Sequence, residues 1–483
     1  MLTGGQVHQG EEGAVRYRMG YVWIISLVAA MGGLLFGYDW VVIGGAKPFL
    51  EKFFELNNEQ QVGWANSCAL VGCLLGSLFT GGLSDRCGRK KLLIAAALLF
   101  MISSILTGWA ATFDQFVLWR ISGGIAIGMA SNLSPVYIAE IAPTFVRGRL
   151  VAINQLTIVM GIVAAQSVNW IIAQPVPDLA SAEFIRSSWN GQYAWRWMFT
   201  AVAVPSLVFF LGAIFIPESP RWLVKRGFTE RARDILEKIG GRRYADSQVL
   251  EIQKSHAAKE EHDFRFREIL RPKPAKILMV GITLAVLQQW SGINVIFNYA
   301  EEIYRSAGYG LSEILFNIVI TGAINLVFTL LAIGTVDRLG RRFLMLLGCA
   351  GIALSHLLIG TAYILALKGL SVLLFTLCAL GCYALSLAPI TWVLISEIFP
   401  NRIRGTAVSI AVSALWIACF ILTYTFPLLN RALGTAGTFW LYSTICAAGF
   451  LFVFFFVPET RDKSLEQIEH ELWGSTGPSD YRS

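Results

Sequence analysis

The amino-acid sequence predicts an all-α polytopic membrane protein in which twelve transmembrane helices form two parallel, pseudo-symmetric six-helix bundles. Three observations carry this prediction: an apolar composition, twelve long apolar runs and an internal repeat. Of the 483 residues, 55% are hydrophobic and only 15% are charged. Soluble proteins carry about 25% charged residues, so this composition and the mean hydropathy of +0.58 indicate that lipid surrounds much of the chain.

Each apolar run is long enough to cross a bilayer as a helix, which takes about 20 residues. A transmembrane β-barrel is excluded, because the runs are too long and do not alternate with a period of two. The first run is also too long for the core of a cleavable signal peptide. The predicted spans are 20–46, 61–83, 91–112, 115–140, 149–172, 195–216, 276–303, 311–336, 342–366, 369–396, 406–430 and 436–457.

Basic residues predict the orientation of these spans. If the N-terminus is cytoplasmic, 31 of the 39 Lys and Arg residues fall in segments that face the cytoplasm. The positive-inside rule therefore favours a cytoplasmic location for both termini. This asymmetry accounts for the net charge of +7, so no nucleic-acid partner is expected. None of the eight cysteines lies in a predicted external loop, and neither disulfides, a metal site nor a cofactor is expected.

The second half of the chain repeats motifs of the first. GGLSDRCGRKK at 81–91 returns as IGTVDRLGRRF, AEIAPTFVRG at 139–148 as SEIFPNRIRG, and PESPR at 217–221 as PETRD. Each copy follows an even number of spans, so the two halves have the same orientation. Parallel repeats of this kind are typical of transporters that bind substrate near the midplane. The predicted domains are bundles at 1–216 and 275–457, a cytoplasmic linker at 217–274 and a cytoplasmic tail at 458–483.

The linker is expected to form short cytoplasmic helices beneath the bundles. Residues 231–241 place Ile235, Leu236 and Ile239 on one helical face, with Gly240 as a stop signal. A flexible linker rarely shows such a period.

The motifs, taken together and in order, resemble the sugar porters of the major facilitator superfamily across nearly the whole chain. They are DRCGRKK, WRISGG at 119–124, PVYIAEIAPTFVRG, PESPRWL, QQWSGIN at 288–294, VDRLGRR, WVLISEIFPNRIRG and PETRDKSLE. Bacterial proton-coupled xylose porters are the nearest likeness, and human facilitative glucose transporters share the pattern. The resemblance implies the major facilitator fold and transport of D-xylose or a related pentose or hexose by alternating access. We therefore expect a functional monomer, without enzymatic activity, in the bacterial plasma membrane.

Carboxamides inside the spans are candidate sugar ligands, because each offers hydrogen-bond donors and acceptors without charge. An unmatched buried polar group costs about 1–3 kcal/mol. Tryptophans in late spans offer a flat apolar face to a sugar. Amides also join helices, and tryptophans also pack or mark membrane interfaces. The resemblance places sugar-binding residues at Gln155, Gln288, Gln289, Asn294, Asn325, Trp392 and Trp416, and aromatic gate residues at Phe36 and Tyr299.

The chain departs from the family at several of these positions. Asn298-Tyr299 stands where the family usually has paired aromatic residues, and Leu415 and Cys419 stand where porters of this group commonly have amides. Ile162 takes a position that is Gln in the bacterial xylose porter and Ile in human glucose transporters. These differences leave the choice between pentose and hexose open.

Asp39 is a lone carboxylate in the apolar run GGLLFGYDWVVIGG. An acidic residue inside a span costs about 2.5–3.5 kcal/mol, so it needs a partner or a proton. The proton-coupled relatives place an Asp and an Arg at the positions of Asp39 and Arg120, and a carboxylate beside an arginine can switch between ion pair and neutral acid. The resulting prediction is a sugar:proton symporter. Two alternatives remain: a facilitative uniporter with a static ion pair, and a non-transporting sugar sensor. A membrane enzyme would need a cluster of catalytic residues, and the sequence shows none.

Charged residues at the cytoplasmic ends of the spans form a predicted gate. Carboxylates and arginines in the repeated motifs can pair across the two bundles only while the cytoplasmic side is closed, so opening that side must break them. The family is thought to work in this way, whereas simple topology signals would explain the basic residues alone. The expected gate residues are Asp85, Arg89, Lys90, Glu140, Arg147, Asp337, Arg341, Arg342, Glu397 and Arg404.

Overall fold

The computed structural model describes residues 17–177, 181–260, 272–367, 369–399 and 404–461. In the N-terminal half, five long helices form the first five spans: α1 (Met19–Phe53), α2 (Glu59–Cys87), α3 (Arg89–Gly108), α4 (Phe113–Ile141) and α5 (Arg147–Ile172). The short helix α6 (Ala182–Ser187) and a π-helical turn (Asn190–Ala194) lead into α7 (Trp195–Thr200) and α8 (Ala203–Phe215), which form the sixth span.

The C-terminal half repeats this plan with more interruptions. Its first span is divided into α12 (Pro272–Trp290), α13 (Ile293–Asn298) and α14 (Ala300–Ser306). The next two spans are α15 (Leu311–Leu339) and α16 (Arg341–Ile364), followed by α17 (Leu370–Leu385) and α18 (Leu387–Glu397). The helix α19 (Arg404–Phe456) contains the last two spans, because Gly434 breaks it with φ 68° and ψ 168°.

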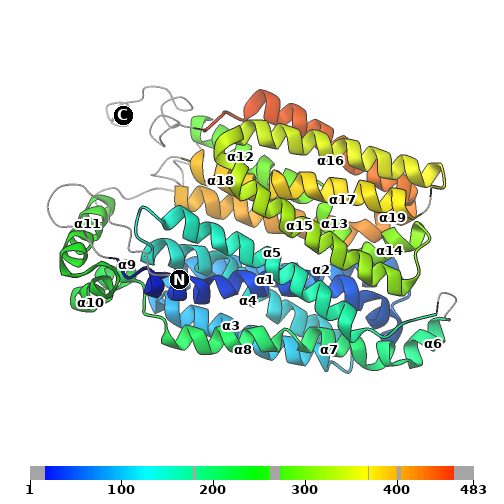
Figure 1. Ribbon diagram of the computed structural model, residues 1–483, viewed down its shortest axis with the longest axis horizontal. Helices are drawn as coiled ribbons and strands as arrows, with labels where there is room; N and C mark the ends of the chain where they lie inside the picture. The colour runs from blue at the N-terminus through cyan, green and yellow to red at the C-terminus, as the bar shows by residue number, and fades with distance from the viewer. Residues whose placement is uncertain (1–16, 178–180, 261–271, 368, 400–403, 462–483) are drawn as a thin grey trace, which may run out of the picture.

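These helices confirm the predicted twelve-span major facilitator fold. Eleven stretches of the described chain are long and apolar enough to cross a membrane, and one of them is the doubly spanning α19. Figure 1 shows the two halves side by side, with α1–α8 in one half and α12–α19 in the other. The halves meet where α2 packs on α19, where α5 packs on α15, and where α1 reaches α13 and α14.

Two spans of the C-terminal half that the sequence predicts as continuous are broken in the structure. The seventh span turns at Gly292, whose φ of 82° lies in the left-handed region that glycine adopts without strain. His356 accompanies this break, with Nε2 2.8 Å from the carbonyl oxygen of Ser291. The tenth span breaks at Ser386, and the Gln288 side chain donates to the carbonyls of Leu387 and Ala388 at 3.1 Å each. Side chains thus replace the backbone hydrogen bonds that each break removes.

Three short helices between the halves confirm the helical character predicted for the linker. They are α9 (Pro220–Lys225), α10 (Thr229–Gly240) and α11 (Arg242–Glu260), and they share a small apolar core that includes Leu223, Leu236 and Val249. The backbone N–H of Arg18 donates to the carbonyl of Ile239 at 2.8 Å, which fixes α10 beside the start of α1. We call this end of the molecule the linker end and the other the opposite end (Figure 1).

Candidate functional site

A buried ion pair lies inside the N-terminal half. Arg120 Nη1 on α4 donates to Asp39 Oδ2 on α1 at 2.8 Å, and the two residues are only 3% and 4% exposed. The guanidinium carbon of Arg120 also lies 5.3 Å from the centre of the Phe199 ring. The pairing expected from the resemblance is therefore present, and Asp39 has a cation partner from 81 positions along the chain.

Three of the predicted sugar ligands form one hydrogen-bonded group at the break of the seventh span. Gln289 Nε2 donates to Gln288 Oε1 at 3.3 Å, and Asn294 Nδ2 donates to Gln289 Oε1. Asn294 also lies 3.6 Å from the sulfur of Cys419 on α19. The thiol of Cys419 thus occupies space beside this amide group, at a position where an amide is common in the resembling family.

Aromatic side chains from both halves converge near this group. The rings of Phe36 and Trp40 on α1 lie 5.9 Å and 6.1 Å from the ring of Trp416 on α19. Trp416 is buried, and its Nε1 has no hydrogen-bond partner among the described residues. Tyr299 is buried farther toward the opposite end, where its hydroxyl donates to the carbonyl of Thr423 at 2.7 Å.

The remaining predicted sugar ligands stand apart from these contacts. Gln155 on α5 is half-buried and Asn325 on α15 is buried. Within the described part of the chain, neither side chain hydrogen-bonds to another residue. Trp392 on α18 is 38% exposed and makes no ring contact with the Phe36–Trp40–Trp416 group. Their amide groups and the indole N–H are thus not hydrogen-bonded to other described residues.

At the linker end, the charged residues of the N-terminal half pair with one another. Arg89 donates to both carboxylate oxygens of Glu140, at 3.0 and 3.1 Å, and to Asp85 at 3.2 Å. Lys225 of α9 lies 3.0 Å from Asp85. Glu218 accepts from the backbone N–H groups of Arg89 and Lys90 at 2.8 and 3.1 Å, which caps the start of α3.

The C-terminal half repeats this arrangement. Arg341 lies 3.6 Å from Glu397, as Arg89 lies beside Glu140. Glu459 accepts from the backbone N–H groups of Arg341 and Arg342 at 2.9 and 3.1 Å, as Glu218 does at α3. The sequence reveals the repeat of PESPR as PETRD but not this capping role. A glutamate at the same place in both copies could have indicated that the two residues do the same task.

Five of the predicted gate residues are thus paired within a single half: Asp85, Arg89 and Glu140 in the first, and Arg341 and Glu397 in the second. Arg342 instead donates to the carbonyl of Phe454. Among ion pairs whose two members are both described, none at the linker end joins the two halves. Arg147 lies at the start of α5, near Arg221, Tyr244 and Glu251. The side chains of Asp337 and Arg404 lie outside the described residues.

At the opposite end, a lysine that sequence reasoning missed joins the two halves. Lys47 is 1% exposed inside α1, and its ammonium contacts the carboxylates of Glu302, Glu51 at 3.1 Å and Glu301 at 3.6 Å. Arg305 binds the other oxygen of Glu301 at 2.7 Å. A sequence signal existed, because Lys47 and Glu51 share a helix face and two adjacent glutamates stand at the end of an apolar run.

Other contacts at the opposite end also cross between the halves. Arg431 on α19 pairs with Glu59 on α2 at 2.8 Å, and the backbone N–H of Val176 donates to Ser312 Oγ at 3.0 Å. Gly44 packs so closely on α13 that a Cβ would collide with the carbonyl oxygen of Phe297. The opposite end is therefore closed by direct contacts between α1, α2, α13, α14 and α19.

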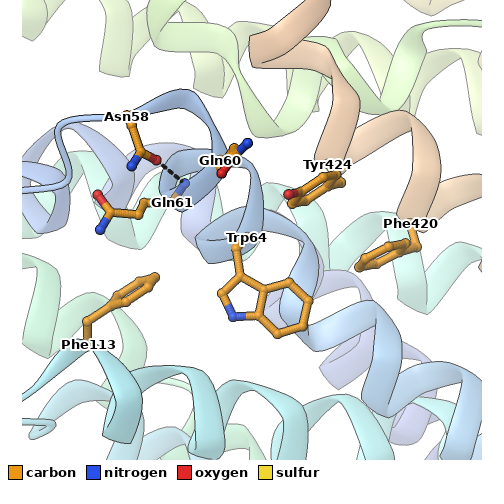
Figure 2. A pocket seen from close by; sticks show the side chains of 7 residues that line it. All are labelled: Asn58, Gln60, Gln61, Trp64, Phe113, Phe420 and Tyr424. Carbon is orange, nitrogen blue, oxygen red and sulfur yellow. Dashed lines mark hydrogen bonds between the residues drawn. The ribbon is translucent and has the colours of Figure 1, made fainter.

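A cavity of about 430 Å³ lies at the opposite end between α2, α4 and α19. Figure 2 shows Trp64 between Phe113 on one side and the stacked rings of Phe420 and Tyr424 on the other. The Asn58 carboxamide is engaged as the N-cap of α2, accepting from the backbone N–H of Gln61 at 2.8 Å. None of the predicted sugar ligands lines this cavity.

Comparisons with known proteins agree on one family. The family described as "Sugar (and other) transporter" matches residues 25–472. The D-xylose-proton symporter of Escherichia coli is 38% identical over 489 residues, covering 95% of this chain and 97% of the relative. The arabinose-proton symporter of Bacillus subtilis is 38% identical over 458 residues, covering 95% and 96%. A solved structure of the E. coli xylose transporter in a partially occluded inward open conformation superposes with a TM-score of 0.81 at 36% identity, covering 92% of this chain and all of that chain.

Proposed function

The chain belongs to the sugar transporter family, and we propose that it is a secondary transporter that moves a monosaccharide together with a proton by alternating access. The observation that carries this proposal is the buried Asp39–Arg120 pair, which lies in the same membrane-spanning core as an amide group and an aromatic cluster. A uniporter of the same fold would need no ionisable carboxylate at this depth. The names of the two relatives, one for D-xylose and one for arabinose, support a monosaccharide of the pentose class as substrate.

We propose that the sugar binds between the halves, beside Gln288, Gln289 and Asn294. These amides are already fixed by their contacts with one another and with α18, so they need little reorganisation to meet sugar hydroxyls. Gln155 and Asn325 supply amides from α5 and α15, which face one another across the interface between the halves. Trp416, Trp392 and Phe36 supply apolar faces to the sugar. Tyr299 serves as a gate residue between the sugar and the opposite end.

The linker end is proposed to face the cytoplasm, because the basic residues of the linker and of the repeated loops lie there. The protein would then span the bacterial plasma membrane as a monomer with both termini cytoplasmic. In this orientation the contacts at the opposite end close the external side, while the ion pairs between described residues at the linker end each lie within one half. This arrangement corresponds to an inward-facing state.

Alternating access then requires the external contacts to break and the cytoplasmic residues to pair across the halves. The residues that would form this pairing lie at helix ends: Glu140, Arg147, Asp337, Glu397 and Arg404. The proton gradient supplies the drive. One charge crossing a potential of 100 mV releases about 2.3 kcal/mol, which supports roughly a fifty-fold sugar gradient.

Lys47→Met is expected to shift the protein toward the outward-open state. Without the ammonium, Glu51 on α1 faces Glu301 and Glu302 on α14, and like charges repel across the interface that closes the external side. Breaking a buried ion pair costs about 3–5 kcal/mol, enough to shift the populations by about 100-fold or more. Distances between spin labels at Asn57 and Ser306 measure the opening. Lys52→Met in the last turn of α1 is the control, and an unchanged distance distribution in the Lys47 variant contradicts the proposed external closure.

Uptake into proteoliposomes tests the proposed function directly. The purified protein should concentrate at least one labelled pentose or hexose when the outside is made acidic, and a protonophore should abolish the accumulation. Uptake that only equilibrates, whatever the proton gradient, would identify a uniporter. Binding without any uptake would identify a sensor.

A further inference from the structure

A small cavity lies beside the buried ion pair, at the interface between the halves. It has about 10 Å³ of room, which is about enough for one water molecule. Trp40 of α1, Asn66 and Cys73 of α2, and Arg120 of α4 line it from the N-terminal half. Asn298, the last residue of α13, lines it from the C-terminal half.

Three residues around this cavity carry polar atoms without partners in the described part of the chain. They are Arg120 Nε, Asn66 Oδ1 and Asn298 Oδ1. The residues are 3%, 5% and 3% exposed, so bulk water does not satisfy them. Buried polar groups in proteins are nearly always hydrogen-bonded to protein or to ordered water. One donor and two acceptors suit a single water, which can accept from Arg120 Nε–H and donate to the two amide oxygens.

We propose that Asn66 and Asn298 are second partners of Arg120, reached through one water in this cavity, and that they become the remaining polar partners of the guanidinium when Asp39 is protonated. This inference rests on the proposed symport and assigns positioning roles to two residues outside the predicted site. Arg120 uses Nη1 for the Asp39 carboxylate. Its remaining N–H groups are available to neutral acceptors when the carboxylate takes a proton.

Thiols and an aromatic ring surround the pair. The thiols of Cys68 and Cys73 on α2 lie close to it, and the Phe199 ring packs against the guanidinium. No carboxylate lines the cavity. When Asp39 is neutral, the two amide oxygens therefore remain as acceptors that no other described residue engages, beside the cavity that Arg120 lines.

The positions of the two amides give this exchange a mechanical consequence. Asn66 and Arg120 belong to the N-terminal half. Asn298 is the last residue of α13, the short helix that begins directly after the break at Gly292. A hydrogen-bond path from Arg120 to Asn298 thus ties α13 to the N-terminal half, and the guanidinium depends most on this path while the proton is bound. Deprotonation of Asp39 restores the ion pair, so the path to α13 then carries a smaller share of the bonding of Arg120. The family usually has an aromatic residue at this position, and Asn298 supplies a hydrogen-bond acceptor in its place.

A double-mutant cycle between Asp39 and Asn298 tests the inference. Asn298→Leu removes the amide and keeps a side chain with the same number and branching of heavy atoms. The thermal unfolding midpoint of the sugar-free protein and the rate of sugar counterflow are measured for Asp39→Asn, Asn298→Leu and the double variant. In the wild-type background, the ion pair with Asp39 still holds Arg120, so Asn298→Leu should lower the midpoint only slightly. In the Asp39→Asn background the same change should lower the midpoint much further and slow counterflow about tenfold.

Controls distinguish a water-mediated hydrogen bond between Arg120 and Asn298 from simple packing. Asn132→Leu, which removes an α4 amide that donates to the Ser77 carbonyl at 3.2 Å, should show additive effects in both backgrounds. Asn298→Ser, which keeps an oxygen acceptor, should recover part of the loss, and Asn66→Leu should behave like Asn298→Leu. Equal effects of Asn298→Leu in both backgrounds would overturn the proposal. The thermal unfolding midpoint can be measured even if the wild type fails to accumulate sugar. The experiment therefore distinguishes a failure of the proposed Arg120–Asn298 contact from a failure of symport.

Discussion

Asp39→Asn is expected to abolish concentrative sugar uptake while leaving sugar exchange intact. Asparagine has the shape and charge of the protonated acid, so the variant resembles a carrier that is permanently loaded with a proton. Exchange of sugar across the membrane requires no net proton movement and should continue. Release of the proton to the cytoplasm is impossible, so the accumulation ratio should fall from roughly fifty-fold at 100 mV to about one.

Counterflow and acid-driven uptake should be measured in the same proteoliposome preparation. Asp246→Asn is the matched control, because Asp246 pairs with Arg233 at 2.8 Å on the exposed surface of the linker, where an ion pair contributes little. This control should accumulate sugar as the wild type does. If Asp39→Asn still concentrates sugar under an imposed proton gradient, Asp39 is a member of a structural ion pair and coupling lies elsewhere.

Gln155→Ala is expected to weaken sugar binding by about 10- to 100-fold. Its amide has no hydrogen bond to another described residue, so truncation leaves the fold unchanged and deprives a sugar hydroxyl of a partner, at a cost of about 1–3 kcal/mol. Gln288→Ala would confound this result, because Gln288 also holds the start of α18. Titration calorimetry with the transported sugar gives the dissociation constant.

Gln248→Ala provides a matched glutamine on the linker helix α11, where the side chain bonds only to Glu251 among the described residues. Its dissociation constant should equal that of the wild type. An unchanged dissociation constant for Gln155→Ala would remove Gln155 from the proposed sugar site.

Several features of the fold follow directly from the sequence, because they depend on local composition. The twelve spans arise from apolar runs of sufficient length, and α10 ends where Gly240 and Gly241 stop an amphipathic period. The repeated carboxylates and arginines indicate equivalent helix ends, and the structure places Arg89–Glu140 and Arg341–Glu397 in equivalent pairs. The Asp39–Arg120 contact was inferred from resemblance rather than from spacing, because 81 residues separate its members.

Features that depend on long-range contacts were not accessible in this way. Hydropathy ended the first predicted span at residue 46, since a lysine follows, yet Lys47 is buried inside α1 because its carboxylate partners come from α14. The seventh and tenth spans read as continuous apolar runs. Their breaks at Gly292 and Ser386 are stabilised by His356 and Gln288, whose contacts no local pattern reveals.

The most direct test of proton-coupled transport is the change in external pH when sugar is added to de-energised proteoliposomes in a weakly buffered medium. Symport predicts that the medium becomes alkaline as sugar enters, with about one proton taken up for each sugar, and that Asp39→Asn abolishes the change. Sugar entry at the same rate without any alkalinisation would contradict the account and identify the protein as a facilitative carrier.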